Sequence, residues 1–129
     1  MSLNEEQEIG KAVDAYLKAI KTGDKKYFDR AFYPDAVVIN ATERDPEKAT
    51  KPIADFAKGV KTRHDAGIYG EEIPLGTSVS YLGYVANVRL DFKLKIGDRI
   101  LYGTDYFNLV KRNGLWRISQ KIYYITHTK

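Results

Sequence analysis

One carboxylate, Asp105, is predicted to lie on the apolar face of a β-sheet, where an acidic side chain can do chemistry. Asn113-Gly114 and Gly97-Asp98 are typical of two-residue hairpin loops. With both loops in place, the strand register puts Asp105 between Leu90 and Ile122. A buried carboxylate is costly unless it is paired or hydrogen-bonded, so Asp105 must find a partner or take up a proton.

Two side chains from the helical half of the chain are candidate partners for Asp105. Tyr16 and His64 each lie on the apolar stripe of a predicted helix, and they offer a phenol and an imidazole. Asp105 is then either a satisfied buried polar group near a strand end or a group that faces a ligand. His64 is either a partly exposed residue near a helix end or a general base.

Other classical sites are missing from the sequence. The chain has no cysteine, which excludes a disulfide framework, a thiolate zinc site and a cysteine nucleophile. Its two histidines are far apart in sequence, so we expect no metal site and no cofactor. Glu71-Glu72 lies beside Gly70 and Pro74, where the sequence favours a solvated strand entrance over an acid–base pair.

Length and charge define the class of protein. The 129 residues fit a single domain, 1–129, large enough to bury a core. The net charge of +4 is spread along the chain, so we expect no nucleic-acid partner. No long apolar run predicts a membrane span, and residues 1–20 lack the pattern of a signal peptide. We therefore expect a soluble, cytoplasmic protein.

The first half of the chain predicts helices and the second half predicts strands. A helix is expected over about 4–21, with its apolar stripe at Ile9, Val13, Tyr16, Leu17 and Ile20. A shorter helix follows the Asp24 cap, 36–39 forms a short strand, and another helix begins near Asp45-Pro46. Four antiparallel strands follow at roughly 71–82, 84–96, 99–112 and 115–126. The order α-α-β-α-β-β-β-β predicts an α+β domain, with three N-terminal helices on one face of a curved, mainly antiparallel sheet.

The register divides the strand residues between two faces. It sets Leu109 opposite Ile118, Phe107 opposite Gln120, and Leu94 opposite Leu101. The core face collects Val88, Leu90, Phe92, Leu94, Leu101, Phe107, Leu109, Trp116, Ile118 and Ile122, together with Asp105. The outer face collects Asn87, Arg89, Asp91, Lys93, Tyr102, Thr104, Tyr106, Asn108, Arg117, Lys121 and Tyr123.

Three segments carry a resemblance to a known superfamily: 13–24, 32–36 with its Phe-Tyr-Pro-Asp-Ala sequence, and 104–118 with Asp-Tyr-Phe and Trp-Arg-Ile. In order and spacing they resemble the nuclear transport factor 2-like superfamily, which includes ketosteroid isomerase, scytalone dehydratase and SnoaL-like proteins. The last segment, continued to Tyr123, is most similar to the Putative lumazine-binding branch. The resemblance implies a cystatin-like cone with an apolar pocket between helices and sheet. It also implies a homodimer through the outer sheet face, here with Arg89, Tyr102, Tyr106, Lys121 and Tyr123.

The resemblance to ketosteroid isomerase, in which a protonated aspartic acid donates a hydrogen bond, implies roles for three residues. Tyr16 matches the tyrosine donor and Asp105 matches the protonated aspartic acid. Asn40 stands where the aspartate base is expected, and an amide cannot abstract a proton at neutral pH. Whether the protein is an enzyme therefore stays open.

Three functions remain in contention. The first is a small-molecule-binding pocket for a flat cyclic ligand, held by Tyr16, Asn40, His64 and Asp105 inside a wall of Phe28, Phe32, Phe56, Phe107 and Trp116. The second is a SnoaL-like lyase, isomerase or cyclase, in which His64 is the base and Tyr16 and Asp105 stabilise an enolate. The third is a dimeric protein-interaction module, in which Tyr16 and Asp105 hydrogen-bond each other inside the core.

Overall fold

The computed structural model describes the backbone of residues 2–128 and the side chains of residues 5–128. Its helices are α1 (Ser2–Thr22), α2 (Lys25–Ala31), α3 (Pro46–Ala49) and α4 (Ile53–Asp65). Its strands are β1 (Phe32–Asn40), β2 (Thr50–Pro52), β3 (Gly70–Leu82), β4 (Val85–Ile96), β5 (Arg99–Arg112) and β6 (Leu115–Thr128). The expected α+β class is confirmed. The segment after Asp45 differs in detail, because it forms the short helix α3 and the short strand β2 before α4 begins.

The helix boundaries follow local chemistry. Gly23 ends α1 with a φ of +68°, a left-handed conformation that glycine adopts without a Cβ clash. The Asp24 side chain then caps α2 by accepting a hydrogen bond from the backbone N–H of Lys26 at 3.0 Å. Pro52 immediately precedes α4, where its missing N–H leaves no helical hydrogen bond unmade.

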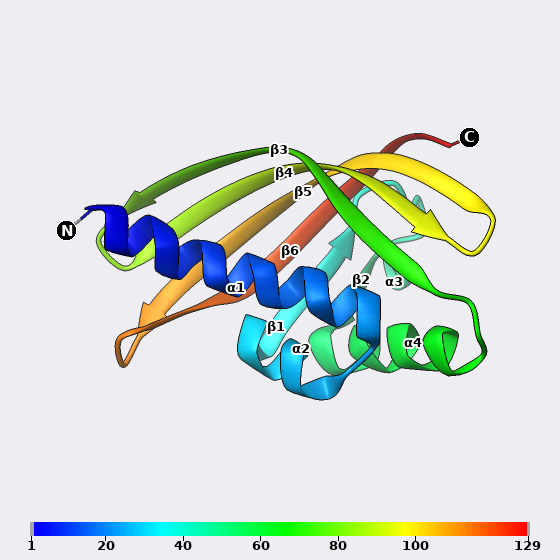
Figure 1. The fold of residues 1–129 in the computed structure, drawn as a ribbon, viewed down its shortest axis with the longest axis horizontal. Coiled ribbons are helices and arrows are strands. Elements are labelled where there is room, and N and C mark those ends of the chain that lie inside the picture. The colour runs from blue at the N-terminus through cyan, green and yellow to red at the C-terminus, as the bar shows by residue number, and fades with distance from the viewer. Residues whose placement is uncertain (1, 129) are drawn as a thin grey trace.

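The six strands form one curved sheet in the order β2-β1-β6-β5-β4-β3. All neighbours run antiparallel except β1 and β6, which are parallel. Figure 1 shows the long strands arching over α1, with α2 and α4 together near one end of the domain. This arrangement buries one face of the sheet against the helices.

The core lies between α1 and the concave face of the sheet. Ile9 and Tyr16 of α1 are buried against strand residues that include Leu90, Phe107 and Leu109. Full burial of one such large apolar side chain is worth about 1.5–3 kcal/mol. The core face expected from the sequence is therefore largely confirmed. Among the described residues, no helix is long and apolar enough to cross a membrane.

Three β-bulges shift the register of the described strands that border the open end of the domain, and one of them leaves Thr126 of β6 as an extra residue. In β6, Leu109 pairs with Ile118 as expected, but Asn108 then pairs with Gln120, so Ser119 is an extra residue. In β3, the pairing moves from Gly76–Asp91 to Pro74–Phe92, so Leu75 is extra. Because side chains alternate with period two, each bulge turns the residues that follow it to the opposite face.

The bulge at Ser119 overturns part of the predicted register. Phe107 pairs with Lys121 rather than with Gln120, and Asp105 pairs with Tyr123 rather than with Ile122. Lys121 and Tyr123 therefore share the inner face with Asp105, whereas they were expected on the outer face. Ile122, expected in the core, lies opposite the outer-face residue Tyr106.

Candidate functional site

A cavity of about 260 Å³ opens between α1, α4 and the curled end of the sheet, and we call it the inner cavity. Its wall combines apolar side chains with six polar ones. The lining residues are Tyr16, Ile20, Asn40, Phe56, Val60, Arg63, Glu72, Phe92, Leu94, Ile96, Leu101, Lys121, Tyr123 and Ile125. An apolar hollow with a few convergent polar groups is typical of a small-molecule site.

A short hydrogen bond joins α1 to β3 at this cavity. The Tyr16 hydroxyl donates to Glu72 Oε1 at 2.6 Å, and both residues are buried. Burial, followed by the negative charges of Asp105 and Glu72, raises the pKa of Tyr16 well above its usual range. Tyr16 therefore stays a neutral phenol that donates a hydrogen bond.

A buried ion pair joins β5 to β6 behind the same wall. Lys121 Nζ lies 3.4 Å from Asp105 Oδ1, and the side chains of Lys121 and Asp105 are 4% and 0% exposed. The Asp105 carboxyl is thus in the interior, as the register predicted, but it does not itself line the inner cavity. Its partner is Lys121 rather than Tyr16 or His64.

The net charge of Glu72, Asp105 and Lys121 depends on one proton. Burial, followed by the Asp105 carboxylate, raises the pKa of Glu72 well above its usual range, although Lys121 opposes the shift. With both carboxyls ionised, Glu72 Oε2 and both Asp105 oxygens have no hydrogen-bond partner. A proton on Glu72 lets the two carboxyls share a hydrogen bond and leaves one carboxylate to balance the single Lys121 ammonium.

Aromatic rings surround the Lys121 ammonium on the cavity side. Lys121 Nζ lies 3.9 Å from the centroid of the Tyr123 ring, and 5.3 and 5.2 Å from the centroids of Tyr16 and Phe56. Contacts of this kind stabilise a desolvated cation by about 2 kcal/mol. Burial and then Asp105 also raise the pKa of Tyr123.

Arg63 brings a second cation to the inner cavity from α4. Its Nε is buried without a hydrogen-bond partner, and burial lowers its pKa from a very high starting value. The guanidinium lies against Gly70, where an added Cβ would stand 2.5 Å from Arg63 Nη2. Gly70 and Glu72 lie on the same face of β3, so Arg63 and Glu72 approach the cavity from neighbouring positions.

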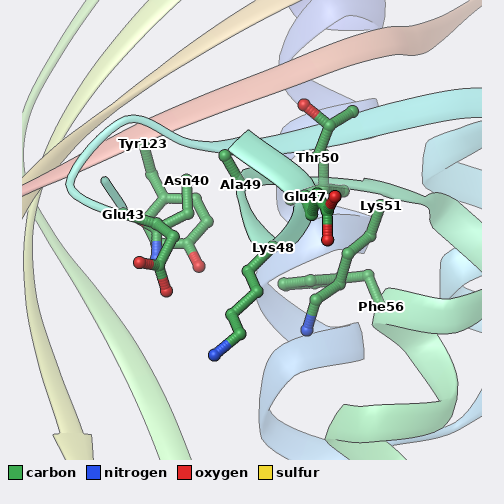
Figure 2. Close-up of a pocket in the computed structure, with 10 residues that line it drawn as sticks. Asn40, Glu43, Glu47, Lys48, Ala49, Thr50, Lys51, Phe56 and Tyr123 are labelled. Carbon is green, nitrogen blue, oxygen red and sulfur yellow. The ribbon is translucent and has the colours of Figure 1, made fainter. Parts of the chain in front are cut away.

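A second, outer cavity of about 430 Å³ adjoins the inner one. It lies between the segment after β1, the short elements α3 and β2, and α4, and Figure 2 shows its labelled lining side chains. Asn40, Phe56 and Tyr123 line both cavities, so these three side chains form the partition between them. The outer cavity carries charged, mostly exposed side chains: Glu43, Glu47, Lys48 and Lys51.

The structure brings together only some of the residues that the sequence singled out. Tyr16, Asn40 and Phe56 line the inner cavity, and Asp105 lies directly behind it. His64 does not line it: its ring packs edge-on against Tyr69, with centroids 5.0 Å apart.

The expected aromatic wall is divided among different places. Phe28 and Phe32 line a separate groove between α2, β1 and α4. Phe107 is fully buried, with its ring edge-on to Tyr16, and Trp116 lines a shallow hollow near Glu8 and Lys11. Of the five aromatic residues proposed to enclose a ligand, Phe56 alone lines the inner cavity.

Four polar residues of the site were missed by sequence reasoning: Arg63, Glu72, Lys121 and Tyr123. For Glu72 the expectation of a solvated strand entrance is wrong, because the residue is 6% exposed. Pro74 was an available signal, since proline inside a strand marks an edge or a bulge, and the Leu75 bulge follows it. The sequence around Ser119 contains no proline that would mark the bulge there. Within residues 5–128, no group of His, Cys, Asp and Glu side chains could hold a metal ion.

Comparisons with other proteins agree with this architecture. The Putative lumazine-binding family matches residues 4–124. A nuclear transport factor 2-like protein of unknown function from Shewanella baltica is 21% identical, with a TM-score of 0.73 and coverage of 100% of this chain and 97% of that one. A Putative Scytalone Dehydratase from Novosphingobium aromaticivorans is 17% identical, with a TM-score of 0.79 and coverage of 99% and 88%.

Another solved structure, a protein from Kribbella flavida, is 12% identical, with a TM-score of 0.84 and coverage of 100% and 95%. No curated protein sequence matches the chain. The likeness to the solved structures shows the fold, and the family match spans nearly all of the sequence. The chain therefore belongs to the Putative lumazine-binding family and has the nuclear transport factor 2-like fold.

Proposed function

We propose that the inner cavity binds a small, flat, cyclic molecule whose polar edge meets Glu72, Lys121 and Arg63. One observation carries this proposal: Arg63, which lines the cavity, has a buried Nε without a hydrogen-bond partner. An unsatisfied buried polar atom costs about 1–3 kcal/mol, so a ligand that completes its hydrogen bonds gains that free energy. The family match to lumazine-binding proteins supports the same class of ligand.

The size and lining of the cavity support a ligand of one or two rings. Its volume of about 260 Å³ is just below the roughly 300 Å³ at which sites for drug-sized molecules begin. Phe56 and Tyr123 offer ring faces, while Arg63 and Lys121 supply donors. A heterocycle with a carbonyl or ring-nitrogen acceptor at its edge matches these donors.

A binding panel tests the proposal. Lumazine, pterin, riboflavin and a steroid are added to the purified protein, and the thermal midpoint and calorimetric affinity are measured. At least one of the two-ring compounds is expected to raise the midpoint, because a ligand that binds only the folded state stabilises it. The Glu72→Leu variant, which removes the carboxyl that holds Tyr16 and Asp105 at the cavity wall, should lose this shift, whereas Glu71→Leu on the other face of the same strand should keep it. If none of the compounds binds, the proposal is wrong.

The second candidate function is a lyase, isomerase or cyclase. The observation in its favour is the pair of buried carboxyls, in which Glu72 keeps a proton while Asp105 is balanced by Lys121. Because the two carboxyls share one proton, Glu72, which lines the cavity, can release or take up a proton while Asp105 behind the wall compensates. His64 is not the base in this version, because it lies outside the inner cavity.

Exchange of deuterium at the carbon next to a ketone tests this activity. Cyclic ketones are incubated with the protein in deuterated buffer, and incorporation is followed by NMR. Activity that is lost in Glu72→Gln and retained in His64→Ala supports the enzyme. Activity that is lost in His64→Ala would restore the histidine mechanism predicted from the sequence.

We also propose that the protein forms a homodimer through the outer face of the sheet. Arg89, Tyr106 and Tyr124 lie on that face, with Arg89 stacked 5.8 Å from the Tyr106 ring centroid. Tyr and Arg are enriched in interfaces. Lys121 and Tyr123, expected to contribute, belong to the inner face instead. Light scattering of the wild type and of Tyr106→Glu tests this proposal: a dimer that becomes a monomer supports it, and a wild-type monomer refutes it.

A further inference from the structure

We propose that the inner cavity selects an anionic ligand, a small flat ring acid whose carboxylate or enolate oxygen is bound by Lys121 and Arg63. The inference rests on the proposed function, because it assumes that this cavity takes a ligand. It adds the charge of the ligand and the two residues that recognise that charge.

The first support is the unused hydrogen-bonding capacity of Lys121. An ammonium group has three donors. Its one ion-pair partner among the described residues, Asp105, lies at 3.4 Å, and neither Asp105 oxygen has a hydrogen-bond partner. The rings of Tyr16, Phe56 and Tyr123 surround the rest of the ammonium. Lys121 therefore lines the cavity with ammonium N–H groups that donate no hydrogen bond to any described oxygen of the protein.

The second support comes independently from α4. Arg63 lines the same cavity, and its buried Nε has no partner. Among the described side chains it makes no ion pair, and Gly70 leaves room for its guanidinium. Tyr16 lines the same cavity, and its ring centroid lies 5.3 Å from Lys121 Nζ.

The charges facing the cavity sum to a positive value. Tyr16 of α1 and Tyr123 of β6 are neutral, and Arg63 of α4 is cationic. Glu72 comes from β3 and Lys121 from β6, and Asp105 of β5 lies directly behind the cavity wall. Asp105 balances Lys121. Because Glu72 keeps its proton in this setting, Arg63 remains without a counter-charge, and a ligand anion can supply it.

The aromatic partition favours a flat anion over a free inorganic one. Phe56 and Tyr123 flank the approach from the outer cavity, and Leu94 and Leu101 close the far side. The ring faces and the leucine side chains offer no hydrogen bonds to a hydrated ion such as phosphate, but they gain free energy by covering a ring.

An isosteric pair of probes tests the inference. Binding of 2-naphthoate and 2-naphthamide, which differ in charge but hardly in shape, is measured by calorimetry at pH 7. The acid is expected to bind at least about tenfold more tightly, because hydrogen bonds to an ionised acceptor are roughly twice as strong as neutral ones. Sodium phosphate serves as the probe for a bare anion, and it should not compete with the acid at equal concentration.

Variants show whether the two cations cause the preference. Arg63→Met should reduce the preference for the acid to about threefold or less, whereas Lys58→Met, an exposed position on the same helix, should leave it unchanged. Removing Lys121 alone leaves the buried Asp105 carboxylate without its ion-pair partner. Lys121→Met is therefore combined with Asp105→Asn, which keeps the interior neutral. This double variant should also lose the preference.

The outcomes separate the two proposals. If acid and amide bind equally, or if Arg63→Met and the double variant both keep the preference, the anionic inference is wrong while the ligand site stands. If phosphate competes as well as the acid, the site recognises charge alone and the ring-acid inference is wrong. If neither probe binds and the panel of neutral ring compounds also fails, both proposals are wrong.

Discussion

Replacement of Lys121 by methionine isolates the buried ion pair on which the inner cavity depends. The methionine keeps most of the aliphatic stem that packs against Phe56 and Tyr123 but removes the charge. Asp105, which is 0% exposed, then loses its one ion-pair partner among the described residues. The cost of the substitution is therefore mainly that of leaving a carboxylate unpaired in the interior.

The expected magnitude follows from this burial. Removing one partner of a buried pair costs about 3–5 kcal/mol, because the remaining charge is uncompensated. Glu72 offers partial relief, because its protonated carboxyl can donate a hydrogen bond to the Asp105 carboxylate. We expect Lys121→Met to lower the free energy of unfolding by about 3 kcal/mol at pH 8. The double variant Lys121→Met/Asp105→Asn should recover to within about 1 kcal/mol of the wild type.

Urea unfolding followed by tryptophan fluorescence measures these free energies, because Trp116 is buried in the core. Domains of this size are stable by about 5–15 kcal/mol, so the single variant should still fold and give a complete transition. A loss below about 1 kcal/mol at pH 8 would refute the reasoning, as would a double variant no more stable than the single one. Lys58→Met, an exposed lysine on α4, is the control and should change stability by less than about 0.5 kcal/mol.

Four further predictions concern the same end of the domain. The pKa of Glu72 is raised above its usual 4.5 in the folded state, so its contribution to stability is present below that value and is lost as pH rises through the folded pKa. Glu72→Gln should therefore be more stable than the wild type at pH 8 and should lose that advantage at pH 4, as measured by urea titration at both values. Leu101→Trp, which fills the inner cavity, should weaken binding of any ligand found there by at least about tenfold in calorimetry while the protein stays folded. Gly103→Ala should lower stability by about 1–3 kcal/mol in urea titration, because its Cβ would stand 2.8 Å from Phe92 Cζ and also meet the Tyr124 carbonyl oxygen. Gly59 lies on helix α4, and a Cβ added there would have no atom outside its own helical backbone and chain neighbours within 4 Å. Gly59→Ala should therefore raise stability by up to about 1 kcal/mol in the same experiment.

The positions of Tyr16 and Asp105 could be predicted because they depend on local patterns. Tyr16 follows from the helical spacing of α1, and its burial is confirmed. Asp105 follows from the Gly97-Asp98 turn, which sets it opposite Leu90 without interruption. Tyr16 was expected to bond Asp105 in one alternative, but its hydroxyl donates to Glu72. Helical and strand periodicity place a residue on a face, and they do not choose its partner across the core.

Glu72 and Lys121 were both assigned wrongly, and in the structure each follows a β-bulge. Lys121 was placed by strand register, which the bulge at Ser119 in β6 shifts. Glu72 was placed from its neighbours Gly70 and Pro74, and it follows the bulge at Leu75 when β3 is traced from its hairpin turn. A single extra residue reverses which side chains face inward. Whether a strand bulges depends on how sharply the whole sheet must curve to cover its helices, and that curvature is a property of the packed domain.

The sequence by itself determined the α+β class, the turns of the three long hairpins, the burial of Asp105 and the family to which the chain belongs. The tertiary structure alone decided that Lys121 pairs with Asp105, that Glu72 meets Tyr16, and that His64 stays outside the cavity. The physical reason is the distance along the chain over which each kind of interaction acts. Capping, turn and periodicity preferences act over a few residues, whereas the inner cavity is formed by side chains from α1, α4 and the bulged ends of β3 and β6, which only the curvature of the sheet brings together.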